Sequence, residues 1–285
     1  KGDRIFILSS LITSMFGVIL LLSVWGKHQQ LGLREAFLLT TSTWITIAIF
    51  SSIPFYMSNL SLSITDAFFE SMSGITTTGA TVINNLELQS KGILIWRALL
   101  QWLGGIGIIV MAVAVLPMLQ VGGMQLFRLE SSDNADKILP RATQIAGSIV
   151  LLYLIITFAC ALSYNIAGMG LFDSLAHALT TISTGGYSTH SDSFGFFDNP
   201  KIEYFAVLFM IIGSLPFVLY LQFVRGKPGN LFLDSQVITF IVILISAIIL
   251  CTIYVHINIG IHYGEALRRA AFNVTSILTG TGYVS

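Results

Sequence analysis

Residues 66–82, DAFFESMSGITTTGATV, decide the fold of this chain. The stretch lies in a sequence that is 54% hydrophobic. It is nevertheless too short and too polar to cross a lipid bilayer, which takes about 20 predominantly apolar residues. Its layout returns twice, in residues 173–189, DSLAHALTTISTGGYST, and in residues 269–285, RAAFNVTSILTGTGYVS. We therefore expect a chain built from repeats that each contain one such stretch.

Two hydroxyl positions and one glycine keep the same spacing in all three stretches. Counting the first residue of each stretch as position zero, positions seven, ten and thirteen are Ser73, Thr180 and Ser276; Thr76, Ser183 and Thr279; and Gly79, Gly186 and Gly282. Hydroxyls three residues apart share one face of a short helix. A glycine recurring in one place indicates a backbone conformation that a side chain would hinder. We interpret each stretch as a re-entrant helix followed by an ion-coordinating strand.

The composition indicates a membrane protein. Only 10% of the 285 residues are charged and the mean hydropathy is +0.83, whereas soluble proteins carry about 25% charged residues. Lys+Arg and Asp+Glu balance at 14 each, and no basic patch supports nucleic-acid binding. Cys160 and Cys251 both lie in apolar segments, which favours packing roles over a disulfide. We predict an all-α polytopic membrane protein.

Six segments are long and apolar enough to cross a bilayer. They are residues 5–25, 35–56, 92–117, 142–163, 202–224 and 237–259. We expect Pro117 and Pro216 to end or kink a span, because proline removes a helical hydrogen bond.

Lysine and arginine in the short loops predict the orientation, because cytoplasmic loops are enriched in both. The loops expected in the cytoplasm on this ground are 26–34, 119–141 and 225–236. The segments 57–91 and 164–201, and the part after His262, are then external. All three repeated stretches fall on the external side, so the repeats run parallel, as around a pore along the membrane normal.

This order of spans and stretches predicts parallel repeats of span, re-entrant pore helix with filter, and span. The predicted parts are a leading transmembrane helix with its cytoplasmic loop, 1–34; a first pore repeat, 35–118; a cytoplasmic connecting segment, 119–141; a second pore repeat, 142–225; and the first half of a third pore repeat, 226–285.

The loops TTTGAT, STGGYST and TGTGYVS hold too many glycines and β-branched residues to be helical throughout. Irregular backbone at membrane depth must be buried in protein or line a water-filled cavity. Carbonyl and hydroxyl oxygens on such a backbone can replace the hydration shell of an ion. The loops hold no ring of the carboxylates that Ca²⁺ prefers, so we expect a monovalent cation.

Polar residues near the stretches have structural explanations. We expect Glu70 to anchor the first pore helix, with an effect on the field at the pore mouth as the alternative. His177 is expected to hydrogen-bond beside the pore, and Arg97 to lie at an interface or to pair with an acidic group. The glycines of segment 101–110, QWLGGIGIIV, favour close helix packing over gating.

Two other classes of function fit the sequence less well. An enzyme would need a nucleophile–base pair or a metal cluster, and the histidines show no ligand spacing. These are His28, His177, His190, His256 and His262. A secondary solute transporter would favour inverted repeats and a charged intramembrane residue against its substrate, and neither is evident in the sequence. We therefore do not expect an enzyme.

Four segments resemble a known family. ITDAFFESMSGITTTGATV at 64–82 and WRALLQWLGGIGIIVMAVAVLPMLQVGGMQLFRLE at 96–130 closely resemble the TrkH-type membrane subunit of bacterial potassium uptake systems, within the Trk/Ktr/HKT superfamily. LAHALTTISTGGYSTH at 175–190 is similar to the second filter of that family, and AAFNVTSILTGTGYVS at 270–285 to its third.

The resemblance implies four repeats around a pseudo-fourfold pore and two leading helices, of which 5–25 would be the second. It implies that K⁺ is the transported ion and that backbone oxygens before each shared glycine bind it. It implies no organic cofactor. The implied metal-binding filter is Thr77, Thr78 and Gly79; Thr184, Gly185 and Gly186; and Gly280, Thr281 and Gly282. Gly280 and Thr281 depart from the hydroxyl pair of the first repeat, which leaves K⁺/Na⁺ selectivity open.

The family further implies a homodimer in the bacterial inner membrane, surrounded by lipids, with a cytoplasmic nucleotide-binding regulatory subunit, a TrkA/KtrA-like RCK ring. The function expected is potassium uptake through a gated, channel-like pore; the alternative is a Na⁺-coupled symporter or a K⁺/Na⁺-permeable transporter of the same superfamily. The second half of the third repeat and the fourth repeat are not in this sequence. We therefore expect a part of a longer protein that does not conduct alone.

Overall fold

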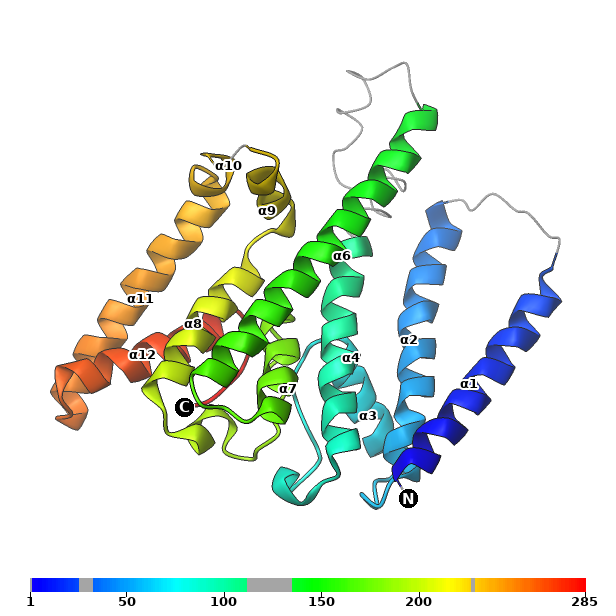
Figure 1. Ribbon diagram of the computed structural model, residues 1–285, viewed down its shortest axis with the longest axis horizontal. Coiled ribbons are helices and arrows are strands. Elements are labelled where there is room, and N and C mark those ends of the chain that lie inside the picture. Colours follow the sequence, from blue (N-terminus) through cyan, green and yellow to red (C-terminus); the bar gives the residue numbers. More distant parts are fainter. Residues whose placement is uncertain (1, 26–32, 112–134, 227–228) are drawn as a thin grey trace.

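The computed structural model describes residues 2–25, 33–111, 135–226 and 229–285, which are helical with irregular connections (Figure 1). The α-helices are α1 (Gly2–Ser23), α2 (Leu33–Met57), α3 (Ile64–Ile75), α4 (Lys91–Val110), α6 (Ala135–Ile166), α7 (Leu171–Ile182), α8 (Pro200–Ser214), α9 (Phe217–Val224), α10 (Gly229–Phe232), α11 (Ser235–Ile259) and α12 (Tyr263–Leu278). Two 3₁₀ turns, Leu86–Leu88 and Ser193–Phe197, lie in the connections after α3 and α7. The all-α prediction is confirmed for these residues.

Five described helices are long and apolar enough to cross a membrane. The spanning stretches are Arg4–Ser23, Phe37–Met57, Lys91–Val110, Gln144–Ile166 and Ser235–Ile259. They confirm five of the six predicted spans, although the end of the span 92–117, with Pro117, lies outside the described residues. Most of the expected connecting segment 119–141 also lies outside them. Its last residues belong to α6, which begins at Ala135, before the predicted start of that span.

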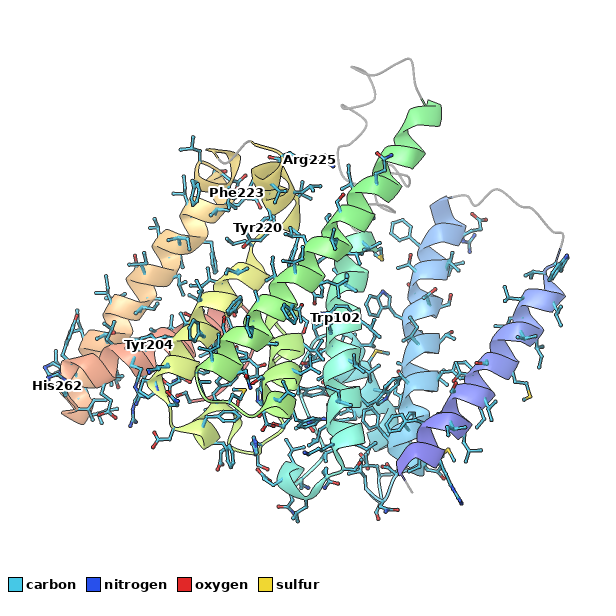
Figure 2. The ribbon with its side chains drawn as sticks, viewed as in Figure 1. Trp102, Tyr204, Tyr220, Phe223, Arg225 and His262 are labelled. Carbon is cyan, nitrogen blue, oxygen red and sulfur yellow. The ribbon has the colours of Figure 1, made fainter. Side chains whose placement is uncertain are left out.

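The sixth predicted span, 202–224, is not one continuous helix. Helices α8 and α9 meet at an angle of 91°, because Leu215 before Pro216 is extended, with φ −79° and ψ 151°. Pro216 has no N–H to donate to the Ile212 carbonyl four residues earlier. The hydroxyl of Tyr220, which is labelled in Figure 2, donates to that carbonyl instead, at 2.8 Å. The expected effect of Pro216 is thus confirmed: the predicted span 202–224 is a pair of helices broken at this proline.

The three repeated stretches begin as the short helices α3, α7 and α12. All three lie toward the lower end of the long helices in Figure 1, whereas α9 and α10 lie at the upper end. Helix α3 packs against α2 and α4, α7 against α6, α4 and α8, and α12 against α11 and α8. Each short helix therefore sits among longer ones, and its carboxyl end leads into an irregular loop.

Glycines on the longer helices bring them against the ends of the short ones. A Cβ on Gly104 of α4 would overlap the Ile75 carbonyl at the end of α3. A Cβ on Gly213 of α8 would lie 2.9 Å from the Ile182 carbonyl oxygen at the end of α7. Ile75 and Ile182 both occupy position nine of their stretches. The expected packing role of the glycines in 101–110 is confirmed at Gly104.

Candidate functional site

The loops of the candidate site begin where α3, α7 and α12 end, and the three helices end alike. The position-ten hydroxyl donates to the carbonyl four residues earlier, at 2.7, 2.9 and 2.8 Å, from Thr76, Ser183 and Thr279. The position-eleven N–H donates to the position-eight carbonyl, at 3.0, 3.0 and 3.1 Å, from Thr77, Thr184 and Gly280. This pattern, with a left-handed residue just past the helix, is typical of the Schellman helix end.

Position eleven is left-handed in all three stretches. Its φ is +56° at Thr77, +50° at Thr184 and +76° at Gly280. A non-glycine residue in such a conformation costs about 1–3 kcal/mol, whereas glycine adopts it readily. Gly280, which departs from the hydroxyl pattern of the first repeat, therefore relieves strain at the same backbone position.

The shared glycines at position thirteen are also left-handed, with φ of +81°, +76° and +83° at Gly79, Gly186 and Gly282. A Cβ on Gly79 would overlap the Gly185 carbonyl oxygen, and a Cβ on Gly186 would overlap the Thr281 carbonyl oxygen. The backbone form predicted for these glycines is confirmed. Successive loops thus meet backbone to backbone, at residues that the family resemblance implies for the filter.

The sequence interpretation placed a strand after each short helix, but the described loops are not β-strands. Left-handed residues at positions eleven and thirteen interrupt the negative φ values that a β-strand requires. The loop residues after the short helices are instead irregular backbone, held by hydroxyl contacts. In the first and third stretches Ser73 donates to the Ala80 carbonyl at 2.6 Å and Ser276 to the Tyr283 carbonyl at 2.7 Å.

Tyrosines at position fourteen join each loop to the one before it. The Tyr187 hydroxyl lies 3.1 Å from the carbonyl oxygens of Glu70 and Ala80 in the first stretch. The Tyr283 hydroxyl lies 3.2 Å from the His177 carbonyl and 2.5 Å from the Thr180 hydroxyl in the second. Glu70 and His177 both occupy position four, so the same contact recurs between successive stretches.

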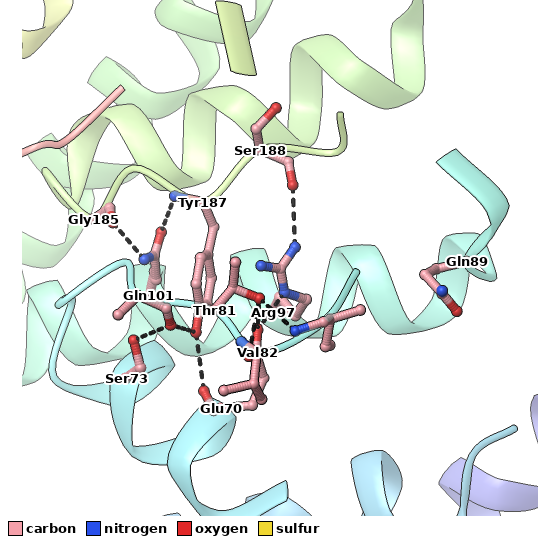
Figure 3. A network of polar contacts seen from close by, with 12 residues as sticks. Glu70, Ser73, Thr81, Val82, Gln89, Arg97, Gln101, Gly185, Tyr187 and Ser188 are labelled. Atoms are coloured by element: carbon pink, nitrogen blue, oxygen red, sulfur yellow. Dashed lines mark hydrogen bonds and ion pairs between the residues drawn. The ribbon is translucent and has the colours of Figure 1, made fainter. Parts of the chain in front are cut away.

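A buried ion pair joins Arg97 of α4 to Glu70 of α3, next to the first loop (Figure 3). Arg97 Nε is 2.7 Å from Glu70 Oε1, and these side chains are 1% and 0% exposed. Glu70 also accepts hydrogen bonds from the Thr81 hydroxyl and the Val82 N–H, each at 3.0 Å. Arg97 Nη1 donates to the Ser188 carbonyl at 3.1 Å in the second loop. The pair is hydrogen-bonded on both sides, and Glu70 has the anchoring role that the sequence indicated.

The junction of the second and third loops carries the opposite arrangement of charge. Here the carboxylate belongs to Glu203 on α8 and the guanidinium to Arg268 on α12, with Nη1 and Oε1 3.0 Å apart. The Ser285 hydroxyl donates to the same Glu203 oxygen at 2.6 Å. At the first junction the arginine comes from the long helix α4 and the carboxylate from the short helix α3. At the second junction α8 carries the carboxylate, and α12, the helix of the repeated stretch, carries the arginine.

The connections that follow the first two loops are joined at the surface. Glu87 accepts hydrogen bonds from the Ser191 N–H at 2.6 Å and from its hydroxyl at 2.9 Å. The bond from the Ser191 N–H is the main cause that holds the pKa of the Glu87 carboxyl below its usual range. This link between Glu87 and Ser191 therefore persists at neutral pH, and it joins residues 104 positions apart in the chain.

Gln101 is a site residue that the sequence interpretation did not single out. It comes from α4 and is fully buried. Its Nε2 donates to the Gly185 carbonyl at 2.6 Å, and its Oε1 accepts from the Tyr187 N–H at 3.0 Å (Figure 3). The signal that marks it is its place, with Arg97, among the few polar residues of the apolar span Lys91–Val110, because polar side chains within a span need partners.

Comparison with known proteins agrees with this architecture. A family model described as TrkH, cation transport protein, matches residues 3–285. The Trk system potassium uptake protein TrkI of Halomonas elongata is 42% identical over 92% of this chain and 53% of its own length. The Trk system potassium uptake protein TrkH of Escherichia coli K12 is 38% identical over 92% of this chain and 56% of its own length.

A solved structure is similar over nearly the whole chain. The crystal structure of the potassium transporter TrkH from Vibrio parahaemolyticus matches with a TM-score of 0.87 and 33% sequence identity, covering 99% of this chain and 58% of that one. The chain thus spans somewhat more than half the length of these relatives. By the family model, the relatives and the fold together, the chain belongs to the TrkH family of cation transport proteins.

Proposed function

We propose that the protein containing this chain takes up potassium across the bacterial inner membrane through a gated, channel-like pore, and that the three loops form part of its selectivity filter. One observation carries the proposal. The three stretches share a helix end, left-handed residues at positions eleven and thirteen, and backbone contacts with one another. The relatives named as potassium uptake proteins support the choice of ion.

In this proposal K⁺ gives up its hydration shell to backbone oxygens of the loops. The proposed ligands belong to Thr77, Thr78, Thr184, Gly185, Gly280 and Thr281, each pair preceding its shared glycine. The carboxyl ends of α3, α7 and α12 lead into these loops, and the partial negative charge of a helix carboxyl end favours a cation there. The membrane potential drives inward movement with about 2.3 kcal/mol per charge per 100 mV.

The proposal includes the parts that the family resemblance implies. The loops face the outside, the protein forms a homodimer among membrane lipids, and a cytoplasmic nucleotide-binding ring controls opening. A Na⁺-coupled or K⁺/Na⁺-permeable transporter remains the alternative within the superfamily, and the ratio of K⁺ to Na⁺ transport separates the two.

The test uses the full-length gene product in a bacterium that lacks its own potassium uptake. Growth and rubidium uptake at low external K⁺ are the readouts, with and without a co-expressed regulatory subunit. We expect rescue, and loss of uptake on Gly186→Ser, whose side chain would overlap the Thr281 carbonyl. Gly147→Ser is the matched control, because Gly147 lies on α6 with nothing within 4 Å of an added Cβ. No rescue despite membrane expression and the subunit would contradict the proposal.

A further inference from the structure

The second loop differs from the other two at position twelve. In the first and third stretches this position is a threonine whose hydroxyl bonds the position-ten hydroxyl, at 2.8 Å for Thr76 with Thr78 and 2.8 Å for Thr279 with Thr281. In the second stretch position twelve is Gly185, which has no hydroxyl to offer. The second loop therefore lacks the brace that the other two contain.

Gln101 occupies the place of the missing side chain. A Cβ on Gly185 would overlap Gln101 Cδ and lie 2.5 Å from its Oε1. The glutamine amide uses its donor on the Gly185 carbonyl and its acceptor on the Tyr187 N–H. Glycine at position twelve and glutamine on α4 thus fit together, and the amide holds the loop on both sides of Gly186.

The helix that carries Gln101 is itself fixed against the first stretch. Gly104, less than one turn away, brings α4 against the Ile75 carbonyl. Arg97, one turn earlier, forms the buried pair with Glu70. Gln101 therefore lies on a helix that is held against the first stretch, and its amide binds the second loop. This contact is next to the one between Gly79 and the Gly185 carbonyl.

We propose that Gln101 is a positioning residue that sets cation discrimination in the second loop; this rests on the proposed filter function. A carbonyl oxygen has two lone pairs, so Gly185 can accept the amide hydrogen bond and still face an ion. Discrimination between K⁺ and Na⁺ depends on the size of the cavity and on the number and field strength of the coordinating carbonyls. Without the amide, the backbone from Thr184 to Tyr187 loses two hydrogen bonds and gains freedom to close around the smaller Na⁺.

The test compares three variants in the full-length protein, expressed with its regulatory subunit where uptake requires one. Gln101→Met keeps the shape of the side chain and removes both hydrogen bonds. Gln101→Glu keeps an acceptor and, because burial favours the neutral acid, a donor. Gln89→Met is the matched control, because the Gln89 amide bonds the carbonyls of Asn84 and Asn85, away from the loops (Figure 3).

The readout is competition of K⁺ and Na⁺ against rubidium uptake, with membrane level and thermal unfolding measured on each variant. Because Gln101→Met removes both hydrogen bonds that hold the second loop, we expect it to lower K⁺/Na⁺ discrimination about three- to tenfold. Gln101→Glu should retain most of it, and Gln89→Met all of it.

A folded Gln101→Met protein with unchanged discrimination would overturn the proposal, as would equal losses in the Met and Glu variants. If Gln101→Met fails to assemble, Gln101→Asn, whose amide is one methylene short, replaces it. Failure of both to assemble would make Gln101 a structural residue only and would also overturn the proposal. Absence of uptake by the unchanged protein would instead contradict the proposed function itself, and with it the premise on which this inference depends.

Discussion

The Tyr187 hydroxyl donates a hydrogen bond to the backbone carbonyl of Glu70, 3.1 Å away on the preceding stretch. Tyr283 makes the same contact to His177, at 3.2 Å. Position fourteen of one stretch is thus tied to position four of the stretch before it. Both links run from a later stretch back to the one before it.

Removing the first link should destabilise the fold. Tyr187→Phe leaves the Glu70 and Ala80 carbonyls without the tyrosine donor, so we expect the free energy of unfolding to fall by about 1–3 kcal/mol. Thermal unfolding of the purified protein in detergent measures it. Tyr204→Phe is the control, because Tyr204 is 53% exposed on α8 (Figure 2). Equal stability of the two variants would show that the tyrosine link contributes nothing.

Two glycine-to-alanine changes should have opposite effects on stability. Gly280 is left-handed with nothing within 4 Å of an added Cβ, so Gly280→Ala tests conformation alone and should cost about 1–2 kcal/mol. Gly147 lies in the α6 helix with equally open space, so Gly147→Ala should stabilise by about 0.5–1 kcal/mol. Thermal unfolding of both variants decides the matter. A stabilising Gly280→Ala would rule out the left-handed helix end.

Breaking the buried ion pair from one side should be worse than removing both charges. Arg97→Met leaves the Glu70 carboxylate buried without its cation, which typically costs about 3–5 kcal/mol. Adding Glu70→Gln to that variant removes the unpaired charge and should recover part of the loss. A double-mutant cycle on thermal unfolding compares the stability losses of the two single variants and the double variant. If the two single losses simply add in the double variant, the result would contradict the pairing.

Cysteine labelling tests which end of the helices faces outward. Leu88 is 82% exposed in the connection after the first loop, and Leu233 is 78% exposed between α10 and α11. In a background without other accessible cysteines, an impermeant maleimide added to intact cells should label Leu88→Cys and spare Leu233→Cys. The opposite labelling would invert the predicted orientation.

The sequence predicted those features that follow from local chemistry. The repeated glycines and hydroxyls indicated the short helices and the left-handed glycines such as Gly79, because the same backbone form needs the same residues each time. The length of the apolar segments likewise predicted the spans, and Pro216 marked the break between α8 and α9. These features depend on near neighbours in the chain.

Contacts between residues far apart in the chain could not be predicted from the sequence. The pairing of Gln101 with Gly185 joins residues 84 positions apart in the chain, and no spacing rule links them. The left-handed conformation of Thr77 and Thr184 also runs against the preference of threonine for extended backbone, so these residues suggested a strand. In both cases tertiary contacts, rather than local preference, decide the conformation.

We propose that the three loops select the transported cation, and Gly79→Ser probes this selection at the contact between the first and second loops. The full-length protein and this variant are reconstituted in vesicles, and K⁺ and Na⁺ fluxes are compared, with Gly147→Ser as the control. A side chain on Gly79 would meet the Gly185 carbonyl oxygen, so we expect the folded variant to discriminate less between the two ions while the control is unchanged. Unchanged discrimination in a folded Gly79→Ser protein would contradict the claim that these loops form the filter.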